Sequence, residues 1–120
     1  MIVLWIMLAG GLGAAVRFIS DGLIRTVLGR TFPWATLIIN VVGAFVLGIM
    51  TGLVLYHHAS TDSKLIIGTG FCGGFTTFST ASFETVRLIE ERRFVAALFQ
   101  TLGNACFTIL AAGYGIWLVR

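Results

Sequence analysis

A short polar segment in an otherwise apolar chain is the first feature that could do chemistry. The stretch GFCGGFTTFSTASFE, residues 70–84, holds three glycines, five hydroxyl side chains and a terminal glutamate. Hydroxyl groups donate and accept hydrogen bonds and carry no charge at neutral pH. The segment could therefore replace the water shell of a small ion, while its glycines loosen the backbone that carries the hydroxyl groups.

Three further polar side chains lie within apolar runs. Asn40 stands in LIINVVGAF, and its amide offers two donor hydrogens. Asn104 and Thr108 are one helical turn apart, so they share a helix face. The hydroxyl residues that could complete a polar track with them are Ser79, Thr80 and Ser82. Every member can donate and none is a fixed charge, which suits a small, strongly hydrated anion. For Asn40 alone, a hydrogen bond between helices without a ligand is the simpler interpretation.

The composition indicates that these residues lie in a membrane. The 120 residues are 58% hydrophobic and 11% charged, whereas a soluble domain carries roughly 25% charge. So small a globule cannot bury the excess apolar surface, and lipid is the simplest solvent for it. The net charge is only +3 and no basic stripe is present, so nucleic acid is not an expected partner. No nucleophile–base or metalloprotease pattern occurs, and we expect no enzyme.

We expect an all-α membrane protein with a single domain, residues 1–120, that crosses the bilayer four times. A bilayer core of about 30 Å requires about 20 helical residues. The stretches that meet this length are about 1–28, 34–56, 64–88 and 94–119. Within the second, Ala44, Gly48 and Gly52 repeat every fourth residue, a spacing that lets helix backbones approach closely.

The third span contains Gly73-Gly74 near its middle, and two interpretations are open. The glycines could break the helix, with Thr76 and Thr77 capping the half-helix that follows. Irregular backbone is tolerated in hydrocarbon only where it is buried or lines a polar path, and its free carbonyl groups can hold a small cation. Alternatively, the glycines permit a close crossing between two intact helices.

The basic residues are unevenly distributed among the predicted connectors. Two of the eight Lys and Arg residues, Lys64 and Arg120, fall on one side of the membrane. The other six are Arg17, Arg25, Arg30, Arg87, Arg92 and Arg93. By the positive-inside rule, both termini lie outside the cytoplasm of a multi-pass plasma-membrane protein.

Charged residues within or beside the spans have simple structural interpretations. Arg17 lies deep in the first span, where it can reach the interface with Asp21 as its helix partner. Glu84, together with the charges at 87–93, is most simply the solvated end of a helix.

Three motifs together resemble the CrcB/Fluc family of fluoride ion channels. They are GGLGAAVRF at 10–18, TFPWATLIINVVGAFVLG at 31–48 and GFCGGFTTFST at 70–80. The resemblance implies a four-helix subunit, with the third helix broken, that forms an antiparallel, dual-topology dimer with a second subunit. Such a dimer carries two narrow fluoride pathways and a structural sodium ion at its interface. It exports fluoride passively and so lowers fluoride toxicity in the cytoplasm.

The resemblance also implies roles for individual residues. Gly73 and Thr76 match the positions whose backbone carbonyls hold the sodium ion. Asn40 matches the pore asparagine, and Phe78 matches the first of two pore phenylalanines. The neighbouring positions of the family's polar segment are occupied by Ser79, Thr80 and Ser82.

Further matches lie on the first span, the last span and the helix after the polar segment. Thr108 falls where the family places a pore hydroxyl, and Asn104 and Ala112 lie at the turns before and after it. Arg17 matches the arginine that closes the first motif. Glu84 matches a glutamate commonly found after the polar segment, and we take both as structural residues.

The chain departs from the family pattern at the second pore phenylalanine, which is Ala81 here. Phe83 lies two residues later and points about 200° away on a helix, so it is not a replacement. Ala35 replaces a glycine, a minor change. The loss at Ala81 favours an alternative in which the chain is a non-conducting or half-active subunit of a heterodimer. A small multidrug or guanidinium exporter is a distant alternative, because it needs a carboxylate in the first span and Asp21 lies beyond Arg17.

The basic-residue asymmetry predicts a single orientation in the membrane. A C-terminal alkaline phosphatase fusion should be active and a C-terminal fluorescent protein fusion should be dark, because the bias places the C-terminus outside the cytoplasm. Comparable activity of both fusions would contradict this prediction and indicate insertion in two orientations.

Overall fold

Three long apolar helices form most of the computed structural model, which describes residues 1–29 and 31–120. They are α1 (Ile2–Leu28), α2 (Trp34–His57) and α6 (Phe94–Leu118). Each has 24 to 27 residues and is apolar enough to cross a membrane. At about 1.5 Å per residue such helices are roughly 36–40 Å long, enough for a bilayer core and part of its head-group layer. The described residues contain no strand, and the expected all-α membrane protein is confirmed.

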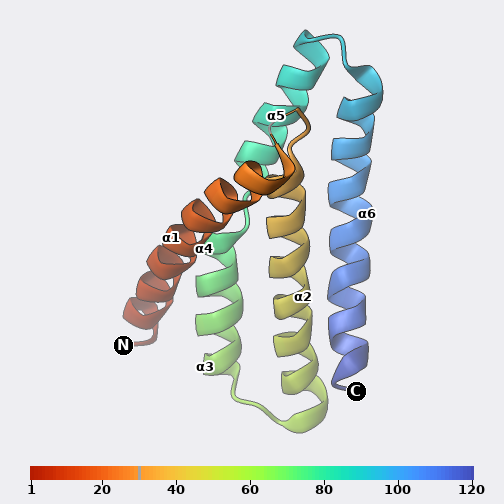
Figure 1. The fold of residues 1–120 in the computed structure, drawn as a ribbon. Coiled ribbons are helices and arrows are strands. Elements are labelled where there is room, and N and C mark those ends of the chain that lie inside the picture. The colour runs from red at the N-terminus through yellow and green to blue at the C-terminus, as the bar shows by residue number, and fades with distance from the viewer. Residues whose placement is uncertain (30) are drawn as a thin grey trace.

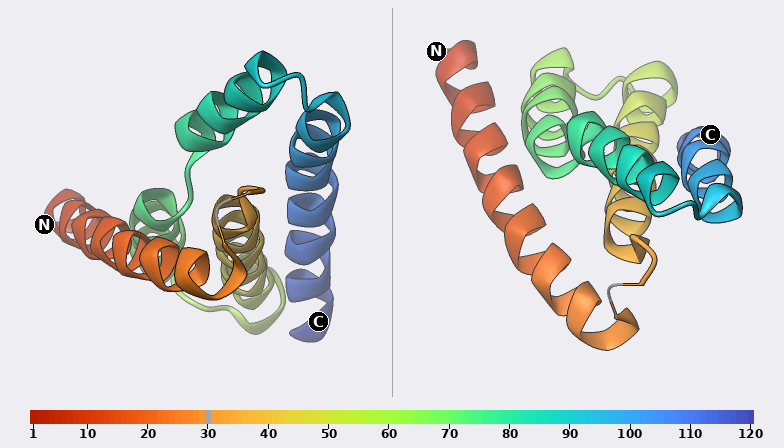
Figure 2. Two further views of the ribbon diagram at one scale, coloured as in Figure 1. Left: turned by 45° about the horizontal axis from the view of Figure 1, so that its top comes forward. Right: turned by 90° about the horizontal axis from the view of Figure 1, so that it is seen from above.

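Between α2 and α6 the chain forms two helical pieces rather than one (Figure 1). The first piece, residues 61–75, comprises α3 (Thr61–Ser63), the π-helix η1 (Lys64–Cys72) and α4 (Gly73–Phe75). The second is α5 (Phe78–Glu90). Figure 2 shows that α5 leaves the direction of the 61–75 piece and crosses toward the start of α6.

The backbone leaves the helix at Thr76 and Thr77, which have extended ψ angles of 163° and 124°. Both the N–H and the hydroxyl of Thr76 donate to the Cys72 carbonyl at 2.8 Å, which closes the preceding helix. Thr77 then caps α5, because its hydroxyl oxygen accepts from the Thr80 N–H at 3.1 Å. The interruption thus lies at Thr76 and Thr77, and Thr77 caps the second half-helix as expected, whereas a break at Gly73-Gly74 itself is wrong, since both glycines belong to α4.

Gly74 serves a close crossing with α1 instead. A Cβ atom on Gly74 would overlap the Gly10 carbonyl, and one on Gly13 would overlap the Phe71 carbonyl. The two backbones therefore touch where at least one side lacks a side chain, as small-residue packing in membranes requires. Of the two interpretations of Gly73-Gly74, the close crossing accounts for Gly74, whereas the change of direction belongs to the threonines.

The α2–α6 pair is held by a second seam of small residues. A Cβ atom on Gly48 would overlap Ala112 of α6, and one on Gly52 would overlap Val119, which follows α6 directly. From the other side, a Cβ on Gly115 would overlap the Phe45 carbonyl and approach the Ile49 nitrogen to 2.9 Å. The small residues at every fourth position of α2 thus mark the surface that contacts α6.

Both termini lie at one end of the molecule, and the α1–α2 and α5–α6 connections lie at the other (Figure 1). The Arg93 guanidinium donates to the Thr31 carbonyl and joins these two connections. The basic residues on the α1–α2 and α5–α6 side of the chain are Arg25, Arg87, Arg92 and Arg93. Arg17, which was also assigned to this side, lies within α1, and Arg30 lies outside the described residues.

The α2–α6 seam predicts opposite effects for two glycines on one helix. Gly115→Ala should destabilise the protein by about 1–3 kcal/mol, because the new methyl group overlaps α2 backbone. Gly113→Ala is the matched control. Nothing lies within 4 Å of its Cβ position, so it should be neutral or stabilising by up to about 1 kcal/mol through helix propensity. Thermal unfolding in detergent measures both, and equal shifts would contradict the assigned seam.

Candidate functional site

The centre of the candidate site is a side chain of α2 that pairs with the backbone between α4 and α5. The Thr77 N–H donates to Asn40 Oδ1 at 2.9 Å, and Asn40 Nδ2 donates to the Thr77 carbonyl at 3.1 Å. The asparagine amide thus binds both the N–H and the carbonyl of Thr77, in the way that a residue of a neighbouring β-strand would. In a continuous helix the Thr77 N–H would bond to the Gly73 carbonyl; here it bonds to Asn40.

A chain of amides extends this pairing to α6. Asn40 Nδ2 also donates to Asn104 Oδ1 at 2.9 Å, and Asn104 Nδ2 donates to the Gln100 carbonyl at 2.8 Å. Both hydrogens of the Asn40 amide are therefore engaged within the chain. Asn104 retains one N–H that can donate to a ligand.

A groove of about 940 Å³ runs along this network between α2, the 61–75 piece, α5 and α6. None of its lining residues is charged among those the structure describes. Its polar wall consists of amides and hydroxyls, and the N-terminus of α5 opens into it at Phe78. A helix N-terminus carries partial positive charge from its unpaired N–H groups, so the groove favours an anion.

The groove brings together most of the residues selected from the sequence. Those that line it are Asn40, Gly73, Thr76, Phe78, Ser82, Asn104 and Thr108. Ser79 and Thr80 are not among its lining residues. On α5 the lining positions are Phe78, Ala81, Ser82, Thr85 and Val86, which follow the 3.6-residue period of one helix face.

Sequence reasoning missed Gln100, which also lines the groove. Its side chain is fully buried, yet neither its amide nitrogen nor its amide oxygen has a hydrogen-bond partner in the described part of the chain. A buried amide without partners costs free energy, so a ligand or water would gain by meeting it. Its spacing of four residues before Asn104 places it on the same face, and this signal could have identified it.

The Thr108 hydroxyl is engaged with its own helix. It donates to the Asn104 carbonyl and lies 3.2 Å from the Ala105 carbonyl. A hydroxyl can rotate, so Thr108 can instead donate toward the groove.

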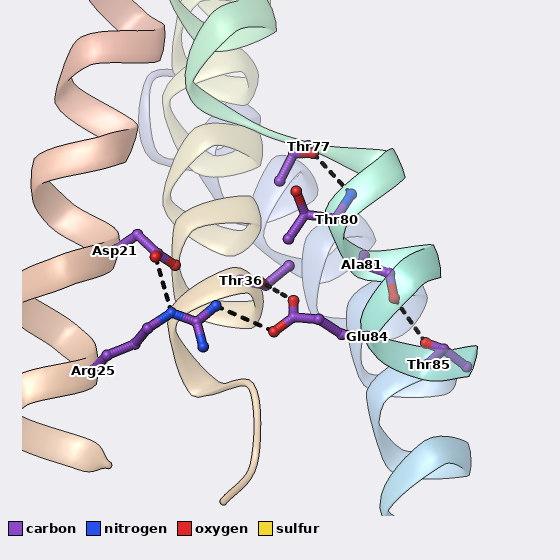
Figure 3. A network of polar contacts seen from close by, with 8 residues as sticks. All are labelled: Asp21, Arg25, Thr36, Thr77, Thr80, Ala81, Glu84 and Thr85. Atoms are coloured by element: carbon purple, nitrogen blue, oxygen red, sulfur yellow. Dashed lines mark hydrogen bonds and ion pairs between the residues drawn. The ribbon is translucent and has the colours of Figure 1, made fainter. Parts of the chain in front are cut away.

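Glu84 forms a polar network with α1 and α2 beside the groove (Figure 3). It is 3% exposed, accepts a hydrogen bond from Thr36 and pairs with Arg25 Nη2 at 3.2 Å. Arg25 Nε also pairs with Asp21 at 2.9 Å. The interpretation of Glu84 as a solvated residue is therefore wrong, because Arg25 and Thr36 compensate a buried carboxylate. Asp21 pairs with Arg25 rather than with Arg17.

The aromatic side of the groove is incomplete. Phe78 lines it with 87% of its surface exposed, and Ala81 lines it one turn later. Phe83 is 68% exposed and is not a lining residue. The reasoning that Phe83 does not take the place of a second phenylalanine thus agrees with the structure.

These features define a class of protein: a small multi-pass protein of the cell membrane, with an uncharged donor-lined groove along its helices. The profile of the family described as "CrcB-like protein, Camphor Resistance (CrcB)" matches residues 4–116. With nearly the whole chain matched, this chain belongs to the CrcB family.

Curated relatives are similar over almost the full length. A protein of Leifsonia xyli subsp. xyli named "Fluoride-specific ion channel FluC 1" is 48% identical over 98% of this chain and 86% of its own length. "Fluoride-specific ion channel FluC 2" of Cutibacterium acnes is 48% identical over 98% and 97%. "Fluoride-specific ion channel FluC" of Pyrococcus furiosus is 39% identical over 96% and 93%.

The Asn40 pairing predicts an unequal cost for two asparagines. Asn40→Ala should destabilise the protein by several kcal/mol, because the Thr77 N–H and carbonyl lose their partner and each unsatisfied buried group costs about 1–3 kcal/mol. Asn104→Ala removes one bond to Asn40 and should cost about 1 kcal/mol. Thermal unfolding and hydrogen exchange of the Thr77 amide measure these effects. Unchanged protection of that amide in Asn40→Ala would refute the pairing.

Proposed function

We propose that the chain is a subunit of a fluoride-selective ion channel that lets fluoride leave the cytoplasm passively and so lowers its toxicity. The observation that carries this proposal is the groove, whose lining offers amide and hydroxyl donors without a charged side chain. The names of the relatives support fluoride as the ion.

The chemistry of the groove suits a small anion with a strong hydration shell. Such an ion enters a narrow path only if hydrogen-bond donors replace its water. Gln100, Asn104 and Thr108 supply donors along one face of α6, and the Ser82 hydroxyl supplies another from α5. A fixed positive charge would trap the ion, whereas neutral donors allow it to leave, as conduction requires.

The third membrane span, in this proposal, consists of the 61–75 piece and α5, joined by the extended residues Thr76 and Thr77. With α1, α2 and α6 this makes four crossings. The two termini then lie on the same side of the membrane, in agreement with their position at one end of the molecule in Figure 1. Pairing of Thr77 by Asn40 explains how a bilayer tolerates the interruption.

A second, antiparallel subunit completes the path in this proposal. The groove is open on one side, and Gly73 and Ala81 on its wall leave room for a partner's side chains. Gly73 and Thr76 also fit a structural sodium ion at the interface. The Gly73 carbonyl lacks its helical Thr77 partner, and carbonyl oxygens are ligands that a hard cation prefers. A bound sodium ion would crosslink the two subunits electrostatically.

Ala81 favours a second candidate for the assembly. A groove that carries one phenylalanine and one alanine on α5 is short of one aromatic side chain. Together with the basic-residue bias, this supports a heterodimer in which a homologous chain of opposite orientation supplies the missing groups. In that assembly this chain would be a half-active or non-conducting partner.

The fluoride path is tested by efflux from liposomes. Asn40→Asp should abolish fluoride efflux, because it adds a negative charge next to Asn104 and removes the N–H groups that bind the Thr77 carbonyl and Asn104. Thr108→Val should reduce efflux by about tenfold, because loss of one hydrogen bond to the ion raises the free-energy barrier to its passage by about 1.4 kcal/mol. Chloride efflux should be absent throughout.

Thr51→Val is the matched control. Thr51 also bonds to a carbonyl of its own helix, at 2.8 Å, but does not line the groove. Its efflux should equal that of the native protein. Each protein is assayed alone and with a homologous second subunit, after a check that it elutes as folded material. Unchanged efflux in folded Asn40→Asp would refute the assigned path.

A further inference from the structure

A second cleft, of about 560 Å³, lies at the end of the molecule where the α1–α2 and α5–α6 connections meet. Its walls include Phe32, Trp34 and Phe99, and Arg92 and Arg93 stand at its rim. This cleft shares no residue with the donor-lined groove. It therefore calls for an explanation that the proposed fluoride path does not provide.

The aromatic wall is a packed unit. The ring centroids of Phe32 and Trp34 are 4.8 Å apart, those of Phe32 and Phe99 are 5.4 Å apart, and those of Trp34 and Phe99 are 6.1 Å apart. Tryptophan gathers at the level of lipid head groups, where one end of its ring is apolar and the other is wet. The wall thus places the cleft at the membrane surface.

Arg92 occupies a backbone position that favours glycine. Its φ angle is +59°. The Arg92 N–H donates to the Ile89 carbonyl at 3.0 Å and the Arg93 N–H to the Leu88 carbonyl at 2.8 Å. These two bonds form the motif that commonly ends a helix with a left-handed glycine. A side chain here strains the backbone, so the arginine is held against a local preference.

Neither rim arginine is neutralised by an acidic side chain. Among the described residues, ion pairs join Arg25 to Asp21 and Glu84, and none involves Arg92 or Arg93. Glu90 and Glu91 are exposed neighbours, but they do not line the cleft. Arg93 uses part of its guanidinium for the Thr31 carbonyl. The remaining N–H groups of both arginines can bind an oxyanion.

We propose that this cleft binds the head group of an anionic phospholipid. Guanidinium groups bind phosphate oxygens through paired hydrogen bonds. Directly below the rim, Phe94 and Val95 begin α6 with 61% and 83% of their surfaces exposed, and apolar side chains at that depth meet acyl chains. A ligand that joins a phosphate to a hydrocarbon chain satisfies both halves of the cleft, whereas a free phosphate satisfies only the rim.

The net charge of the lipid decides the selectivity. A phosphatidylglycerol head group brings one negative charge to two arginines, whereas phosphatidylcholine brings an additional cation that the rim repels. Basic residues near the membrane surface contribute about fivefold each to binding of anionic lipid. We therefore expect a preference of about five- to thirtyfold for phosphatidylglycerol.

Fluorescence quenching of Trp34 measures this preference without reference to fluoride. The full chain with Trp5→Phe and Trp117→Phe keeps Trp34 as its only tryptophan. It is reconstituted in phosphatidylcholine vesicles that contain either brominated phosphatidylglycerol or brominated phosphatidylcholine. Brominated phosphatidylglycerol should quench Trp34 at a five- to thirtyfold lower fraction of the lipid. A chain that keeps only Trp117, which is 62% exposed and lies in the last turn of α6, should show no preference.

Two further measurements complete the test. Arg92→Gly combined with Arg93→Gln should abolish the preference, and Arg92→Gly should preserve the helix end because glycine suits its φ angle. Arg92→Lys should retain most of the preference. Equal quenching of Trp34 by both lipids, or a preference that survives loss of both arginines, would overturn the proposal. Loss of the preference when inorganic phosphate is added at constant ionic strength would show a simple anion site and would also overturn it.

Discussion

The structure depends on one requirement: a peptide that leaves a helix inside an apolar bundle must still pair its N–H and carbonyl groups. Asn40 meets it for Thr77 with a single side-chain amide. Because the N–H and carbonyl of Thr77 are hydrogen-bonded to Asn40, α5 can take a new direction. It begins at Phe78, with Thr77 as its N-cap. The same amide reaches Asn104 and ties α2 to α6. The groove, its polar wall and the helix N-terminus that opens into it all follow from this arrangement.

The long helices could be predicted from sequence because length and apolar content are local properties. The place where the third helical region changes direction could not, since it is fixed by a partner 37 residues away in the sequence. Glycine propensity pointed to Gly73-Gly74, but the crossing with Gly10 keeps these residues helical. The low helix propensity of the glycines therefore indicated roughly where the helix is interrupted. The hydrogen bonds from Asn40 determine which residues, Thr76 and Thr77, leave the helix.

The candidate site shows the same division. Asn40, Asn104 and Thr108 were found because polar side chains are conspicuous in apolar runs. Ser79 and Thr80 can be selected only by residue type, and neither lines the groove. The helix period places Thr80, but not Ser79, on the side of α5 opposite Ser82. The burial of Glu84 could not be predicted, because its partners Arg25 and Thr36 belong to helices remote in sequence.

The seam between α1 and the 61–75 piece has a consequence for biosynthesis. Gly10 and Gly13 contact residues that leave the ribosome after all of α2. At roughly 5–20 residues per second, this delay is on the order of a few seconds. During that time α1 resides in lipid with its glycine face uncovered, which its apolar surface permits. Docking of α1 on the 61–75 piece therefore waits until that piece has been made, and a chaperone or insertase that shields Gly10 and Gly13 would act within this interval.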